Sequence, residues 1–300
     1  MAKRSKGSSS SGSGSSSSSA STQVVLAVRI QRFLPFMGFH HVLMILVAIA
    51  IVLLSLLLAG CSSSSPLVPD IFLIDFFYKS YTPQYDPTQV NPGVAAAIAN
   101  IVGEALLEVR VGYFGLCVTP DGHSYLCSNN ATLLAEQISI EQDPLNLIYI
   151  ANTFKNDVVF PYLLIVAIVF AFACFVVLAT FPSFHTLRER DGTTYDIKTF
   201  PNRFAAQGAL ALIFIASVFV LVSVLWQHTA SVAAAQVAQD FGNGSVKSGV
   251  GAAAMVLGWF GFVLFILVTL SLTVLVLSIS LLSTLADDES ESSGSSGSSR

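Results

Sequence analysis

Residues 36–60 read FMGFHHVLMILVAIAIVLLSLLLAG, an apolar run without a single Asp, Glu, Lys or Arg. A helix needs roughly 20 such residues to cross the hydrocarbon core of a bilayer, so this run predicts a transmembrane helix. The whole chain has the same bias: 53% of its 300 residues are hydrophobic and 11% are charged, and the mean hydropathy is +0.71. That composition excludes a soluble globular domain and predicts a protein of the lipid bilayer.

Three further uncharged runs reach spanning length, at Val159–Phe181, Phe204–Gln227 and Val250–Leu285. The sequence therefore predicts a mainly α membrane protein built on a bundle of four transmembrane helices. The predicted segments are a Ser/Gly-rich tail (1–32), the first span (33–60), a long loop domain (61–158), the second span (159–181), a short loop (182–203), the third span (204–227), another loop (228–249), the fourth span (250–285) and a C-terminal tail (286–300). The fourth run exceeds the thickness of the hydrocarbon core, so its helix should tilt or continue beyond the membrane.

The distribution of Lys and Arg predicts the orientation. Positive residues gather in residues 1–32 and in the loop at 182–203, whereas the loops at 61–158 and 228–249 hold few. By the positive-inside rule, both termini should be cytoplasmic and those two loops extracellular. Two N-glycosylation sequons, at Asn130 and Asn243, fall in the loops assigned to the outside.

Both tails are compositionally biased. Residues 7–21 are almost entirely Ser and Gly, and residues 290–300 are similar, following a short acidic run. Such segments cannot bury enough apolar surface to offset the entropy of ordering, so we expect disordered cytoplasmic tails.

The most patterned stretch outside the predicted spans is Gly112-Tyr113-Phe114-Gly115-Leu116-Cys117, which is followed by Cys127 across a Pro-Asp-Gly turn. If the turn centres on Asp121 and Gly122, Cys117 lies opposite Leu126 and within one position of Cys127. A disulfide that pins a small β-hairpin is then geometrically plausible, the alternative being two unpaired cysteines in a loop. The two glycines would let the strand bend or let another backbone approach closely.

Other parts of the long loop also carry local signals. Ile71–Tyr78 is strongly apolar but too short to span, so we expect it to pack on the bundle or lie at the membrane interface. Gly93–Glu104 has the pattern of a helix, and Leu106–Val118 is rich in residues that favour strands.

Cys61 follows Leu57-Leu58-Ala59-Gly60, a pattern also found in bacterial lipoprotein signals. Cleavage before this residue would leave a lipidated N-terminus. The alternative is a free thiol at the outer membrane edge, favoured here because the apolar run begins more than 30 residues into the chain, behind the Ser/Gly tail. Cys174 lies within the second span and is expected to be an inert small hydrophobe.

The loop at 61–158 is acidic, with ten Asp and Glu residues against three Lys and Arg, a net charge of −7. Such a surface would concentrate cations near the membrane. The acids are scattered without the ligand spacing of a calcium loop, so no metal site is predicted. Glu136, Glu141 and Asp143 come nearest to a group and are the candidates for attracting calcium; the alternative is a solvated acidic face.

The four spans, the long first outer loop and the motif at Gly112, Gly115, Cys117 and Cys127 resemble the claudin-like superfamily, and within it the fungal factor-induced-gene-one family. The resemblance covers Phe33 to about Ala286. It implies a claudin-like fold and a plasma-membrane regulator of calcium influx and of cell or membrane fusion during mating. The claudin motif carries a Trp that this loop lacks, which puts claudin-type junction sealing in doubt.

The resemblance also implies partners: calcium-channel subunits or other membrane proteins of mating fusion, besides the lipid bilayer and further copies of this chain. No nucleic acid is expected. The alternative function is a claudin-like or eisosome-associated organiser of membrane domains or an adhesion protein.

The residues themselves favour a regulator over a channel, because no Asp, Glu, Lys or Arg lies at membrane depth in any predicted span. His40 and His41 lie near the inner end of the first span, where they could occupy the interface or form a proton relay. No catalytic grouping, metal-ligand cluster or phosphate loop occurs in the sequence, so we expect neither an enzyme nor a cofactor.

Overall fold

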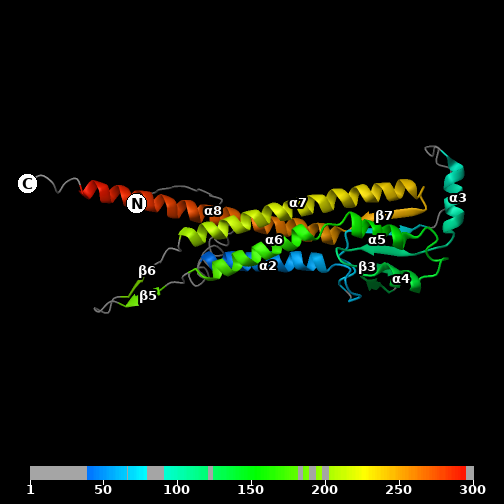
Figure 1. Ribbon diagram of the computed structural model, residues 1–300, viewed down its shortest axis with the longest axis horizontal. Helices are drawn as coiled ribbons and strands as arrows, with labels where there is room; N and C mark the ends of the chain where they lie inside the picture. Colours follow the sequence, from blue (N-terminus) through cyan, green and yellow to red (C-terminus); the bar gives the residue numbers. More distant parts are fainter. Residues whose placement is uncertain are drawn as a thin grey trace, which may run out of the picture.

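The computed structural model describes residues 39–65, 67–79, 91–120, 124–181, 185–188, 194–197 and 203–294. In this part of the chain, four helices are long and apolar enough to cross a membrane. They are α2 (Phe39–Ala59), α6 (Tyr162–Ala179), α7 (Arg203–Phe241) and α8 (Ala252–Gly294). The helices lie side by side in an elongated bundle (Figure 1). The prediction of four spanning helices is confirmed, while the predicted N-terminal tail lies outside the described residues.

Each helix of the bundle packs against two neighbours, in the cyclic order α2, α6, α7 and α8. The shared core consists of large aliphatic side chains, such as Leu54 and Leu164, interleaved with buried alanines, such as Ala167 and Ala216. The small residues let the helices approach closely. Gly261 of α8 illustrates this, since an added Cβ there would press against the side chain of Leu54.

Two helices continue past the predicted ends of their spans. α7 reaches Phe241, so the first part of the loop expected at 228–249 is helical. α8 reaches Gly294, so the start of the expected C-terminal tail is helical as well. No glycine or proline interrupts the chain between Gly208 and Gly242 or between Gly261 and Gly294, so nothing breaks either helix at the membrane edge.

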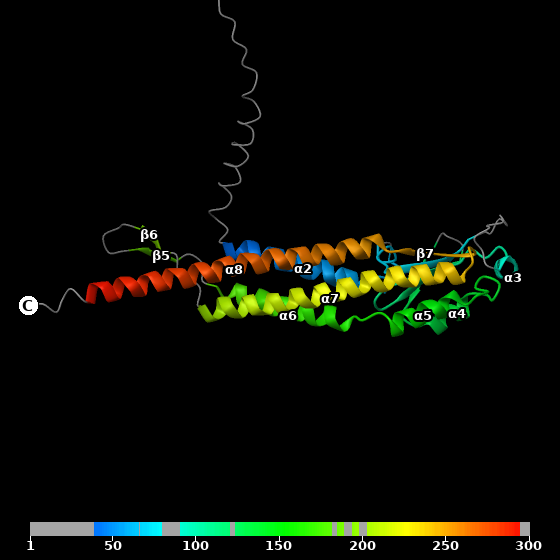
Figure 2. The ribbon, with the colours of Figure 1, turned by 90° about the horizontal axis from the view of Figure 1, so that it is seen from above.

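A five-stranded antiparallel sheet lies at one end of the bundle (Figure 2). Its strand order is β4-β3-β2-β1-β7. The strands are β1 (Ile74–Tyr78), β2 (Glu108–Val111), β3 (Leu116–Thr119), β4 (Leu126–Ser128) and β7 (Val246–Val250). We call this sheet, with the helices that cover it, the sheet domain. A separate hairpin, β5 (His185–Arg188) and β6 (Thr194–Ile197), lies at the other end of the bundle.

One face of the sheet packs on helices. Strands β1 and β2 alternate between buried and half-buried residues, as expected when one face is covered. The covering helices are α5 (Leu147–Asp157) and the end of α7, and their shared core contains Phe76, Val109 and Phe154. α7 therefore serves as both a spanning helix and a wall of the sheet domain.

Two short helices complete the domain. α3 (Pro92–Val102) begins where predicted, with Pro92 at its start and the Asn91 side chain accepting a hydrogen bond from Gly93 N. α4 (Ala131–Gln137) begins after Asn130, whose side chain accepts from Thr132 N. Neither α4 nor α5 was predicted.

Three expectations for the long loop need correction. Ile71–Tyr78 does not pack on the bundle or the interface as a unit, because Ile74–Tyr78 forms β1, which pairs with β2 on one side and β7 on the other. Leu106–Val118 is not one strand but two, separated by the residues of the motif. In the hairpin, Cys117 pairs directly with Cys127 rather than with Leu126. The expected turn at Asp121 and Gly122 lies outside the described residues.

Candidate functional site

The two glycines of the motif form the turn between β2 and β3. Gly112 N donates to the Gly115 carbonyl at 2.9 Å and closes the turn. The turn presses against the end of α2, so closely that a Cβ on Gly112 would overlap the Gly60 carbonyl oxygen. A Cβ on Gly115 would overlap the carbonyl oxygen of Cys61. The expectation that another backbone approaches these glycines is confirmed, and that backbone belongs to the first span.

Tyr113 leaves this turn and enters the core of the bundle. It is buried among the spanning helices, and its hydroxyl donates to Gln227 Oε1 of α7 at 2.9 Å. Burial raises the pKa of Tyr113 to about 12, so the hydroxyl keeps its proton at physiological pH. The neighbouring Phe114 is exposed, whereas Leu116 is buried in the sheet core. The motif thus joins the sheet domain to two spans, α2 and α7.

Removing the Tyr113 hydroxyl tests this connection. In Tyr113→Phe, the buried Oε1 of Gln227 loses its donor, so the free energy of unfolding should fall by about 1–3 kcal/mol. Thermal unfolding of the purified protein in detergent measures the effect. Tyr149→Phe is the matched control, because the Tyr149 side chain is 63% exposed and its variant should melt with the wild type. Equal melting temperatures for both variants would contradict the proposed connection.

Cys61 lies directly beneath the turn. Its thiol is free and buried, and Sγ lies 3.7 Å from the Ile71 carbonyl oxygen. Burial raises the pKa of Cys61 to about 12, so the thiol is not ionised and is a poor nucleophile. Cleavage before Cys61 would also remove α2, whose side chains fill the bundle core. These observations support the interpretation of an unmodified thiol that packs under the motif.

The predicted disulfide between Cys117 and Cys127 is present. It links β3 to the edge strand β4 at directly paired positions. Cys127 N also donates to Ser64 Oγ at 3.1 Å, so β4 contacts the segment that follows α2. The bridge therefore fixes β4 to β3, and the hydrogen bond to Ser64 places this edge of the sheet beside the end of the first span.

A half-buried arginine organises the opposite face of the sheet. The Arg110 guanidinium lies between the rings of Phe72 and Tyr125, at 4.7 and 4.4 Å from their centroids. It pairs with Glu108 at 2.6 Å and with Asp70 at 2.9 Å. Two of the ten acids of the loop are therefore partly neutralised by one internal base. The sequence analysis missed this cluster. Glu108 and Arg110 are two positions apart in a strand, so their side chains lie on the same face.

The three candidate calcium-attracting acids do not form a metal site. Asp143 is occupied: its carboxylate accepts from the Tyr78 hydroxyl at 2.6 Å and from the backbone N–H groups of Leu147 and Ile148 at the start of α5. This arrangement stabilises the N-terminus of that helix. Glu136 and Glu141 are exposed. No group of three potential metal ligands exists among the described residues.

The two sequons differ in accessibility. Asn130 is exposed, and its Oδ1 atom caps α4. Asn243 is half-buried with a positive φ of 45°, and its Nδ2 donates to the Phe241 carbonyl at 3.2 Å. Ser245, the third residue of that sequon, is fully buried. In the folded protein, Asn130 is therefore the better placed of the two amides for a glycan.

The two histidines lie in the first turn of α2, at the bundle end away from the sheet domain (Figure 1). Their ring centroids are 4.0 Å apart. The buried polar side chains of the described spanning helices are hydroxyls and one amide. No carboxylate or imidazole is among these buried side chains. The interpretation of His40 and His41 as interfacial residues is favoured over a proton relay.

Comparison with protein families identifies the chain. A family model described as Ca2+ regulator and membrane fusion protein Fig1 matches residues 94–278. This match covers more than half of the chain, and it includes the motif turn, the disulfide and helices α4 to α7. No match to a protein of curated function was found, and the resemblance to the claudin-like superfamily is not shown by these comparisons. The chain belongs to the family of the Ca2+ regulator and membrane fusion protein Fig1, a name that indicates calcium regulation and membrane fusion.

Proposed function

We propose that this protein is a non-enzymatic regulator of calcium influx and of cell or membrane fusion during fungal mating. The observation that carries the proposal is the family match over residues 94–278, which includes four of the five strands of the sheet, together with α6, α7 and most of α8. The protein would act through the sheet domain and through partner membrane proteins, such as subunits of a calcium channel. Calcium regulation and membrane fusion follow from the family; the mating context and the partners are our proposal.

The bundle supports a regulator rather than a pore. Its described core is formed by aliphatic and aromatic side chains in direct contact, and the spans contain no Asp, Glu, Lys or Arg at depth. An ion pathway through a single copy would need polar groups along its length. α7 instead connects the bundle directly to the sheet domain, because this single helix runs from Arg203 to Phe241 and packs in both. A partner bound to the sheet domain would therefore act on the spans through α7 and Tyr113.

We further propose that the protein resides in the plasma membrane with the sheet domain outside and both termini in the cytoplasm. The Lys and Arg distribution, the two sequons and the disulfide all support this orientation. The exposed Asn130 would then carry a glycan.

Two measurements test the proposed function. Deleting the gene should reduce pheromone-stimulated calcium uptake and the fusion of mating pairs, and restoring the chain should recover both. Purified protein in liposomes loaded with a calcium-sensitive dye should conduct no calcium. Normal uptake and fusion after deletion would overturn the proposal, and a change only in the distribution of membrane domains would favour the organiser alternative. Calcium flux in the liposomes would show a channel instead.

A further inference from the structure

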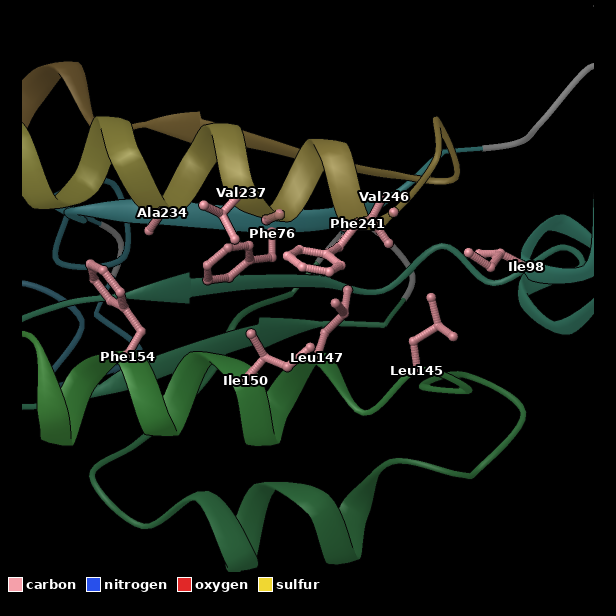
Figure 3. A pocket seen from close by; sticks show the side chains of 12 residues that line it. Phe76, Ile98, Leu145, Leu147, Ile150, Phe154, Ala234, Val237, Phe241 and Val246 are labelled. Carbon is pink, nitrogen blue, oxygen red and sulfur yellow. The ribbon is translucent and has the colours of Figure 1, made fainter. Parts of the chain in front are cut away.

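A cavity of about 440 Å3 lies inside the sheet domain, between β1, α5 and the end of α7. Figure 3 shows apolar side chains from these elements pointing toward a common space. They include Phe76, Ile150, Phe154, Val237, Phe241 and Val246. The volume falls within the range of roughly 300–1,000 Å3 that is usual for ligand pockets.

The cavity is open and its walls are incompletely covered. Phe241 is 78% exposed, Val237 53% and Ile150 44%. Apolar side chains gathered around an open space lose the contacts that a filled core provides, so these residues form an unfilled apolar surface.

The apolar wall continues down α7 into the membrane. Every third or fourth position from the middle of the span to the helix end is apolar, namely Val222, Trp226, Ala230, Ala234, Val237 and Phe241. Val222 and Trp226 are exposed on the bundle surface, where lipid would contact them. Ala234, Val237 and Phe241 line the cavity. One helix face therefore connects the bilayer-facing surface with the cavity.

A second depression of about 10 Å3 lies between these two regions, so an acyl chain would have to follow the outer face of α7 there rather than pass through this depression. Its lining includes the polar Ser223, Gln227 and Ser231 on the bundle side and the apolar Phe154, Trp226 and Ala230, and Phe154 also lines the large cavity. Trp226 Nε1 donates to the Val158 carbonyl at 2.8 Å, which holds the indole at the junction of bundle and sheet domain. Tryptophan is typical of the headgroup level of a membrane. The apolar stripe of α7 therefore passes the level at which the acyl chains of one leaflet end.

We propose that the cavity binds one acyl chain of a bilayer lipid, which enters from the leaflet on the side of the sheet domain and follows the α7 stripe. A long, thin and wholly apolar ligand suits this path because it keeps apolar contacts from the leaflet to Phe241. The inference is independent of the proposed role in calcium influx and fusion, since it rests only on the cavity and its continuity with the bilayer-facing surface.

Photocrosslinking of the full-length protein tests the proposal. The protein is placed in nanodiscs of phosphatidylcholine that contain a trace of phosphatidylcholine with a diazirine at the end of one acyl chain. After irradiation, we expect adducts on residues 150–154 of α5 and 234–241 of α7, beyond the level of Trp226. Peptide mass spectrometry measures their yield.

Two neighbouring substitutions make the test specific. Ala234→Phe places a ring in the cavity and should reduce the adduct yield by about tenfold, because the chain is sterically excluded. Ala233→Phe is the matched control, since Ala233 is exposed on the same helix and does not line the cavity. Monodisperse elution and an intact disulfide verify that both variants fold. Adducts confined to bilayer-facing residues such as Val222 overturn the proposal, as do equal yields from the two variants.

Discussion

Gly115→Ala should detach the sheet domain from the end of α2 and lower the free energy of unfolding by at least about 3 kcal/mol. The added Cβ would overlap the carbonyl oxygen of Cys61 and lie 3.1 Å from Ser62 Cα. These are backbone atoms, so no side-chain rotation relieves the overlap. The chain at Cys61 cannot yield easily either, because this residue is buried and has a positive φ of 55°. Gly112→Ala should have a similar effect through the Gly60 carbonyl.

Thermal unfolding in detergent and the yield of protein at the cell surface measure this loss. Gly208→Ala is the matched control, because Gly208 lies in α7 and no atom would lie within 4 Å of its added Cβ. There the exchange should be neutral or stabilising by about 0.5–1 kcal/mol, since alanine favours the helix more than glycine does. A Gly115→Ala protein that melts with the wild type would show that the turn does not dock on α2.

The four spans were predictable because their signal is local. An uncharged run of about 20 residues has few alternatives to a transmembrane helix, whatever its neighbours are. The helix after Asn91 and the Cys117–Cys127 bridge also follow from residues close together in the sequence. The helical end of α7 had a comparable signal in its alanine-rich sequence at 230–238, which the assignment of a loop overlooked.

The sheet was harder to predict because its order depends on distant segments. β1 lies between β2 and β7, and β7 comes from the short connection between α7 and α8. The sequence of β7, Val-Lys-Ser-Gly-Val, is too short and too polar to indicate a strand by itself. β1 did have a signal, since Ile74, Phe76 and Tyr78 alternate onto the buried face. The overall hydrophobicity of Ile71–Tyr78 led instead to the prediction that this segment packs on the bundle or lies at the membrane interface.

The role of the motif also depends on a contact between segments that are distant in the sequence. Its glycines predicted a close backbone approach, but only the fold shows that the approaching chain is Gly60 and Cys61. The pattern before Cys61 that resembles a lipoprotein signal has a structural reason as well. Position 60 has no room for a side chain, because a Cβ there would overlap the Ile71 carbonyl oxygen. Cys61 packs under the turn. Two patterns that looked unrelated in the sequence are the two sides of one contact.

Removing the disulfide should have the second large effect. Cys117→Ser and Cys127→Ser should each lower the free energy of unfolding by about 2–3 kcal/mol, because the bridge closes a loop with a sequence separation of 10. In the chain-entropy model, a bridge that closes a loop of this length lowers the entropy of the unfolded chain. The folded protein is thereby stabilised by about this amount of free energy. The loss should be seen first at β4, the edge strand that the bridge holds near Ser64.

The double variant distinguishes a shared bridge from two separate packing residues. If the cysteines act only through their bond, Cys117→Ser with Cys127→Ser should be no less stable than either single variant, since each substitution already removes the whole interaction. A reducing agent should lower the wild type to the same level and leave the variants unchanged. Cys174→Ser is the control, because Cys174 is a free thiol in α6 and its variant should remain sensitive to the reducing agent. Additive losses would mean that the two side chains stabilise the domain independently, and that β4 is held by packing and by Ser64 rather than by the bridge.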